Sequence, residues 1–164
     1  MVESALMKAY QAHVAKTRYS LCCFTTRATQ SMNTDPTEKQ TLYMLIGGDT
    51  GVRSLVDRFY DLMEQDTNYS GIRKLHPPSL NNARDKLYWY LSGWMGGPEL
   101  YVERFGHPRM RMRQAAFSIG TNEKDQWLAC MNSALQDTAF DEPIKIRLMQ
   151  AFGQIAEAIR NQPE

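Results

Sequence analysis

The stretch "ARDKLYWYLSGWMGGPELY" (residues 83–101) decides the fold of this sequence, because it holds an amphipathic helix together with its stop signal. Gly96, Gly97 and Pro98 end that helix, since glycine leaves the helical conformation easily and proline cannot continue it. Apolar side chains recur before this stop every three or four residues, which is the spacing of one helix face. They are Ala83, Leu87, Tyr90, Leu91 and Trp94.

A second helix is predicted upstream, in "TGVRSLVDRFYDLM" (residues 50–63), with Thr50 available as its N-cap. Between the two helices, "HPPSL" (residues 76–80) is a break, because consecutive prolines cannot continue a helix. The apolar stripe of this upstream helix is formed by Val52, Leu55, Val56, Phe59, Tyr60 and Met63.

Three more helices are predicted downstream. Pro108 starts a short basic helix, Thr121 caps a longer one, and a last helix follows the sequence Asp-Glu-Pro at residues 141–143. No strand pattern competes, so the sequence predicts an all-α domain. The apolar positions of the two longer helices are Trp127, Leu128, Met131 and Leu135, followed by Leu148, Phe152, Ile155 and Ile159.

Residues 1–31 differ from the rest of the chain. Residues 17–31, "TRYSLCCFTTRATQS", are rich in Ser and Thr, have no acidic residue and show no helical period. We therefore expect an irregular or disordered extension at 1–31 and a functional domain over 32–164, beginning at Met32. Whether the extension is an appendage from an upstream start or a targeting or regulatory tail stays open.

Composition excludes several classes of function. The 164 residues include nineteen basic and eighteen acidic side chains, for a formal charge of +1, which argues against a dedicated nucleic-acid binder. The longest apolar runs are too short to span a membrane, and no stretch is laid out like a secretory signal. Cys22, Cys23 and Cys130 are too few for a disulfide framework. We therefore expect a reduced, cytoplasmic protein with no nucleic-acid or membrane partner.

The residues offer little for hydrolytic chemistry. His13, His76 and His107 form no zinc-ligand spacing, and the glycine pairs lack the lysine and strand of a phosphate loop. What remains is a set of inward-facing aromatic residues that each carry one polar atom: Tyr60, Tyr90, Trp94 and Trp127. They can line an apolar cavity and hydrogen bond to its contents, or they can simply pack in a core.

Three ordered motifs carry a resemblance to a known family. They are "RFYDLM" (58–63), "ARDKLYWYLSGWMGGPELYVERFGHPRMRMR" (83–113) and "FSIG....DQWLACM" (117–131). Together they resemble the group II truncated haemoglobins, from about Met44 to Gln162. The resemblance implies a globin-like two-over-two α-helical sandwich. It also implies one haem b, at which dioxygen or another small diatomic ligand binds.

The resemblance assigns the distal side of that haem. Tyr60 matches the tyrosine whose hydroxyl donates to bound dioxygen, and Trp127 matches the tryptophan that donates from its indole nitrogen. His76 stands where the family usually has Tyr or Phe and adds a third polar group. Convergent donors in a dry pocket stabilise the partial negative charge of the ligand. The residues expected to line the haem pocket are Ala83, Leu87, Tyr90, Trp94, Tyr101, Phe105, Met110, Phe117, Ile119 and Met131.

Three cations are candidates for the haem propionates. Lys86 stands where the family often has a cation, and Arg111 and Arg113 lie on the segment that faces the other side of the haem in the family. Arginine pairs with such carboxylates through charge-assisted hydrogen bonds. The alternative for both arginines is a solvated face with salt bridges.

The proximal position departs from the family. The residue after "RMR" should be the histidine that binds the iron, and here it is Gln114. An amide oxygen is a weak ligand and the amide nitrogen has no available lone pair. His107, a fallback ligand, lies seven residues earlier, about 10 Å away along a helix, and Met110 about 6 Å away. Neither fits without rearrangement, so the resemblance implies weakened or altered proximal ligation.

Three interpretations follow from Gln114. The chain is a haem-binding truncated haemoglobin with weak proximal ligation, or a haem-free globin with a regulatory or interaction role. In the third, Gln114 is a laboratory substitution in an ordinary oxygen-binding globin. A non-enzymatic ligand binder or oxygen carrier is the main expectation. Peroxidase-like or nitric oxide dioxygenase-like side activity, a reductase partner, and a monomeric or homodimeric state are hypotheses.

Overall fold

The computed structural model describes residues 40–106 and 120–159, and all regular elements in these two ranges are helices. Four of the helices are long: α3 (Gly48–Gln65), α5 (Asn81–Trp94), α7 (Thr121–Gln136) and α8 (Glu142–Ile159). The short elements are α2 (Leu42–Leu45), the 3-10 turn η2 (Thr67–Tyr69), α4 (Ser70–Lys74) and α6 (Leu100–Phe105).

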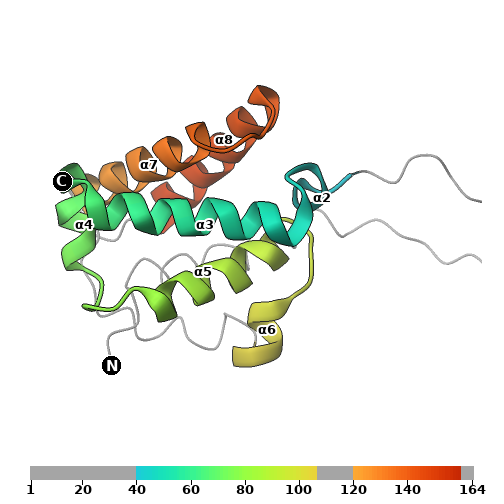
Figure 1. The fold of residues 1–164 in the computed structure, drawn as a ribbon, viewed down its shortest axis with the longest axis horizontal. Helices are drawn as coiled ribbons and strands as arrows, with labels where there is room; N and C mark the ends of the chain where they lie inside the picture. The colour runs from blue at the N-terminus through green and yellow to red at the C-terminus, as the bar shows by residue number, and fades with distance from the viewer. Residues whose placement is uncertain (1–39, 107–119, 160–164) are drawn as a thin grey trace, which may run out of the picture.

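Helix α3 is the centre of the arrangement. It packs against α5 on one side and against α7 on the other, while α8 packs on α7 and α6 on α5 (Figure 1). The pair α3 and α5 thus lies over the pair α7 and α8. This arrangement confirms the predicted all-α, two-over-two sandwich.

The core is built from the predicted stripes. All six apolar positions predicted for the helix at 50–63 are buried in α3, as are the predicted positions of α7 and α8 other than Leu128 and Ile159. Leu128 is half-buried and packs against the core from its edge. Ile159 ends α8, and its side chain lies outside the described part of the chain.

A stack of rings ties α5 to the second helix pair. The Phe152 ring of α8 lies nearly parallel to Trp94 of α5, with 5.4 Å between the ring centroids and 21° between the planes. Phe152 also meets Trp127 of α7 edge to face, at 5.9 Å. Trp94 is half-buried, so its ring covers the core at the rim. Phe152 is therefore the contact shared by three helices.

Both predicted N-caps are wrong, the first by three residues and the second by one. Helix α3 begins at Gly48, because Gly47 adopts a left-handed φ of 88° and turns the chain into the helix two residues earlier than Thr50. Helix α7 begins at Thr121 itself, with Gly120 as the cap. The Glu123 carboxylate accepts a hydrogen bond from the Gly120 backbone N–H at 2.9 Å, which satisfies one backbone donor at that end of the helix.

Several predicted segments lie outside the described ranges. They are the extension at 1–31, the domain start at Met32 and the basic helix starting at Pro108. Among the helices of residues 40–106 and 120–159, none is long and apolar enough to cross a membrane.

The ring stack leads to a prediction about stability. Replacing Phe152 with Ala removes a fully buried ring and leaves a cavity between three helices, so we expect unfolding to become easier by about 3–5 kcal/mol. Ile146→Ala is the matched control, because Ile146 lies on the same helix with 51% of its surface exposed. That change should stay within about 0.5 kcal/mol. Chemical denaturation followed by circular dichroism measures both, and equal losses would contradict the packing.

Candidate functional site

Two of the predicted distal residues meet in the structure. Tyr60 comes from the middle of α3 and is 2% exposed, while His76 follows α4 and is 8% exposed. Their rings are in edge-to-face contact, with centroids 5.7 Å apart and planes at 79°. The short elements after α3 therefore return the chain so that the imidazole covers the buried tyrosine.

The protonation of His76 follows from its hydrogen bond and its burial. Its Nδ1 lies 2.8 Å from the Ile72 carbonyl oxygen, and because a carbonyl only accepts, Nδ1 carries the proton. Burial lowers the pKa of His76 below its ordinary value, against the opposing effect of the Ile72 bond, and the charge of Arg73 lowers it further. The imidazole is therefore neutral at pH 7, and its Nε2 offers a lone pair instead of a proton.

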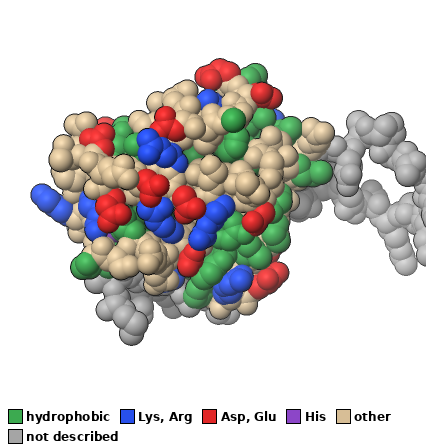
Figure 2. Space-filling view, viewed as in Figure 1, with side chains coloured by type: hydrophobic (Ala, Val, Ile, Leu, Met, Phe, Trp, Pro, Cys, Tyr) green, Lys and Arg blue, Asp and Glu red, His purple; other side chains and the backbone are tan. Residues whose placement is uncertain are grey.

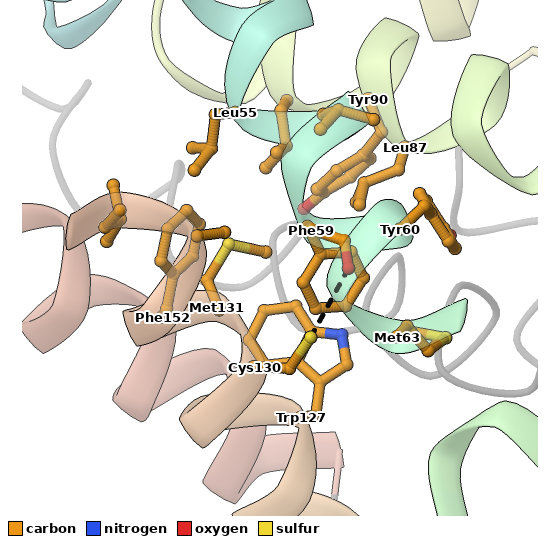
Figure 3. Close-up of a cluster of buried hydrophobic side chains, with 14 of the residues drawn as sticks. Leu55, Phe59, Tyr60, Met63, Leu87, Tyr90, Trp127, Cys130, Met131 and Phe152 are labelled. Atoms are coloured by element: carbon orange, nitrogen blue, oxygen red, sulfur yellow. Dashed lines mark hydrogen bonds between the residues drawn. The ribbon is translucent and has the colours of Figure 1, made fainter. Parts of the chain in front are cut away.

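Trp127 contacts the same Phe59 ring that Tyr60 contacts. The Phe59 ring centroid is 5.1 Å from that of Tyr60 and 5.7 Å from that of Trp127. Trp127 is 4% exposed and comes from α7, so the two predicted hydrogen-bond donors reach one apolar cluster from different helices. Figure 3 shows Phe59 and Trp127 near the centre of that cluster, with Leu87 and Tyr90 of α5 facing them.

Cys130 fixes α7 against the backbone beside Tyr60. Its thiol donates to the Phe59 carbonyl oxygen at 3.4 Å, the dashed line in Figure 3. Burial raises the pKa of Cys130 to about 12, so the sulfur stays a neutral thiol and keeps its proton for this bond. The contact joins α3 and α7 at the residue next to the candidate ligand-binding tyrosine.

Helices α5 and α6 supply a second group of predicted pocket residues. Tyr101 lies 6.2 Å from Tyr90 and 4.9 Å from Phe105, measured between ring centroids. The Lys86 Nζ lies 5.7 Å from the centroid of the half-buried Phe105 ring. Of the other predicted pocket residues that the structure describes, Ala83, Leu87 and Met131 are buried, and Trp94 is half-buried against Phe152.

The rest of the predicted site lies outside the described residues. This set holds the proximal position and the two arginines, so its predictions stay predictions. It comprises His107, Met110, Arg111, Arg113, Gln114, Phe117 and Ile119.

Sequence reasoning missed Arg84. Its guanidinium lies over the Tyr60 ring, 5.6 Å from the centroid, and its Nη2 donates to the Asp61 carboxylate at 2.5 Å. Its Nη1 donates to the Asp57 backbone carbonyl at 2.8 Å. The partners lie 23 and 27 residues earlier in the chain, and no local pattern marks Arg84 among the other arginines.

Comparisons with known proteins agree with this arrangement. The family model described as "Bacterial-like globin" matches residues 41–161. The chain belongs to this globin family, among its group 2 truncated haemoglobins. It is 31% identical over 117 residues to Group 2 truncated hemoglobin YjbI of Bacillus subtilis (strain 168), covering 71% of this chain and 86% of the relative.

Solved structures give the same result. A cold-adapted truncated haemoglobin from the Antarctic marine bacterium Pseudoalteromonas haloplanktis TAC125 has a TM-score of 0.72 and 37% identity, over 76% of this globin and all of the other chain. A group II 2-on-2 haemoglobin from the plant pathogen Agrobacterium tumefaciens has the same TM-score and identity, over 79% of this globin and all of that chain.

Membership of the family implies a haem cofactor and binding of small diatomic gases. The described residues fit such a group. Tyr60 and Trp127 bring a hydroxyl and an indole N–H into a cluster that is otherwise apolar, which suits a flat, mostly apolar cofactor with a small polar ligand. The neutral state of His76 also fits, because it adds no buried charge beside them.

The state of His76 leads to a prediction about pH. Below the ordinary pKa of 6.5, the unfolded chain binds a proton at this imidazole while the folded chain does not, until the lowered folded pKa is reached. The unfolded state then binds more protons, so stability falls as the pH falls through this window. We expect the free energy of unfolding to drop more from about pH 7 to about pH 5 in the natural chain than in His76→Phe.

Urea titrations at several pH values measure this difference. The other two histidines, His13 and His107, are present in both proteins, so whatever they contribute cancels in the comparison. Parallel curves for the two proteins would contradict a buried, neutral His76.

Proposed function

We propose that this globin binds haem b and, at it, dioxygen or another small diatomic ligand, with proximal ligation weakened by Gln114. The observation that carries the proposal is the burial of Tyr60 and Trp127 around Phe59, each with a hydrogen-bond donor in a mostly apolar cluster. A bound haem would supply the iron to which the ligand attaches. In this proposal the main role of the protein is to bind the ligand in the cytoplasm, and peroxidase-like or nitric oxide dioxygenase-like turnover is a side activity.

The two donors suit a ligand that carries partial negative charge. Burial raises the pKa of Tyr60 well above its ordinary value, so the phenol keeps its proton at any physiological pH. The indole nitrogen of Trp127 can only donate. In a dry cluster such hydrogen bonds are stronger than in water, and their geometry is set before the ligand arrives.

His76 has a supporting role in this proposal. Its neutral imidazole presents a lone pair at Nε2, so it does not donate to the ligand at neutral pH. Its edge-to-face contact restrains the Tyr60 ring instead. Protonation at low pH would turn Nε2 into a third donor.

The remaining roles concern how the cofactor is held. Lys86 is buried and lies on the same helix as Ala83 and Leu87, which supports its assignment to a haem propionate. Arg111 and Arg113 are proposed for the same task. With Gln114 as a poor axial ligand, burial of the macrocycle would provide most of the binding free energy, at roughly 25 cal/mol for each Å² of apolar surface.

The weakened proximal bond is tested by restoring the histidine. Gln114→His should retain haem more firmly and give a histidine-ligated absorption spectrum, because imidazole is a much better ligand for iron than a carboxamide. Absorption spectra of both proteins, expressed with haem, measure this. Equal spectra would mean that another residue supplies the axial bond. A folded, helical parent with no Soret band would overturn haem binding and favour the haem-free alternative.

The distal donor is tested by removing one hydroxyl. In Tyr60→Phe, dioxygen should leave about ten- to a hundredfold faster, since a hydrogen bond to a charged group is worth about 1.5–3 kcal/mol. Tyr88→Phe is the matched control, because the Tyr88 hydroxyl is bonded to Asp49 at the surface. Stopped-flow dissociation measures both rates. An unchanged rate in Tyr60→Phe would remove Tyr60 from the ligand site.

A further inference from the structure

Arg84 reaches from α5 to the part of α3 that carries Tyr60. One nitrogen of its guanidinium donates to the Asp57 backbone carbonyl, three residues before Tyr60, at 2.8 Å. The other donates to the carboxylate of Asp61, the residue directly after Tyr60, at 2.5 Å. Between these two bonds the guanidinium carbon lies 5.6 Å from the Tyr60 ring centroid. One side chain therefore holds the helix on both sides of the tyrosine and also touches its ring.

Only an arginine makes this set of contacts. Its planar fork directs two nitrogens at separate acceptors while its face lies against an aromatic ring. The Arg84 side chain is 17% exposed, so these contacts are screened less than a surface pair. A lysine at the same position keeps the charge but loses the fork.

Arg53 provides a natural comparison. It also joins α3 to α5, through a 2.9 Å bond to Asp85, but its side chain is 43% exposed and it lies over the ring of Tyr88. Figure 2 shows acidic and basic side chains interspersed over this face of the molecule. Of these two bridges between α3 and α5, the more buried one contacts the candidate distal residue.

We propose that Arg84 is a positioning residue for Tyr60, which fixes the orientation of the phenol and thereby sets the strength of its hydrogen bond to the ligand. This inference rests on the proposed function, since it gives Arg84 a task only if Tyr60 faces a ligand. In this role Arg84 acts without direct contact to the ligand or the cofactor. Its effect passes through the tyrosine ring and the helix that carries it.

Electrostatics supports the same assignment. Burial raises the pKa of Tyr60, and the charge of Arg84 acts against that rise. A phenol beside a guanidinium is a better hydrogen-bond donor than the same phenol in a purely apolar site. Arg84 thus improves both the direction and the strength of donation.

The test is a double-mutant cycle between Arg84→Gln and Tyr60→Phe, in protein reconstituted with haem. Arg84→Gln should speed dioxygen dissociation about three- to tenfold, a part of the effect of Tyr60→Phe, because the phenol remains but loses the contacts that orient it. It should also move the infrared C–O stretch of the carbon monoxide complex toward that of Tyr60→Phe. In the Tyr60→Phe background it should change neither. Arg84→Lys should give intermediate values, and Arg53→Gln should match the natural chain.

Three results would overturn the inference. The first is an unchanged dioxygen dissociation rate and C–O stretch in Arg84→Gln. The second is that Arg84→Gln changes both readouts equally with and without Tyr60. The third is an equal change in Arg53→Gln. If Arg84→Gln fails to fold, Arg84→Lys takes its place in the cycle, and natural values for it in both readouts would overturn the inference as well.

A second measurement separates this inference from the proposed function. Carbon-13 spectra of ring-labelled tyrosine are recorded on the full chain as purified, with Tyr60 assigned by its loss in Tyr60→Phe. Replacing Arg84 should shift the Tyr60 resonance, and replacing Arg53 should shift that of Tyr88. If the purified chain contains no haem but its Tyr60 resonance shifts when Arg84 is replaced, the proposed function is rejected and the contact between Arg84 and Tyr60 is confirmed. A haem-bound chain in which Tyr60 stays unmoved would reject the inference alone.

Discussion

The burial of α3 between two partners is the constraint on which the rest of the structure depends. Because α5 covers one side of this helix and α7 the other, two adjacent residues of α3 can contact different helices. Phe59 meets Trp127 of α7, while Tyr60 meets Arg84 of α5. Helix α3 thus carries the candidate donor Tyr60 and also packs against α5 and α7, the helices that supply Arg84 and Trp127. Loosening either interface would move the donor relative to the other groups.

The helices could be predicted because their apolar residues repeat with the period of a helix. That period predicts which helix face turns toward the core, but not how deeply each side chain is buried. Leu128 and Trp94 accordingly lie at the edge of the core. Helix starts were harder to predict. Thr50 and Thr121 are good capping residues by type. The left-handed Gly47 and the hydrogen bond to the Glu123 carboxylate nevertheless start both helices nearer the N-terminus than predicted. Such a shift depends on backbone conformation, which the residue types do not determine.

The candidate site also has a part that the sequence predicts and a part that only the structure reveals. The motif resemblance identified Tyr60 and Trp127, and the structure gathers both around Phe59. It also identified His76 as polar, but only the bond to Ile72 shows that the imidazole presents a lone pair. Arg84 was missed because its partners are chosen by the packing of two helices. A sequence shows which side chains can form a fork of hydrogen bonds, and only the fold shows which acceptors they reach.

Under the proposed function, a weak proximal ligand changes which residues matter most. The affinity of a globin for its ligand combines the bond at the metal with the hydrogen bonds around the ligand. If Gln114 contributes little on one side, a larger share of the affinity and selectivity rests on Tyr60 and Trp127. Their precision then depends on the contacts around them: the His76 edge contact, the Cys130 bond to the Phe59 carbonyl, and the Arg84 fork. Such a globin would tolerate changes at the axial position better than changes in these supporting contacts, because the supporting contacts would carry what the axial bond no longer provides.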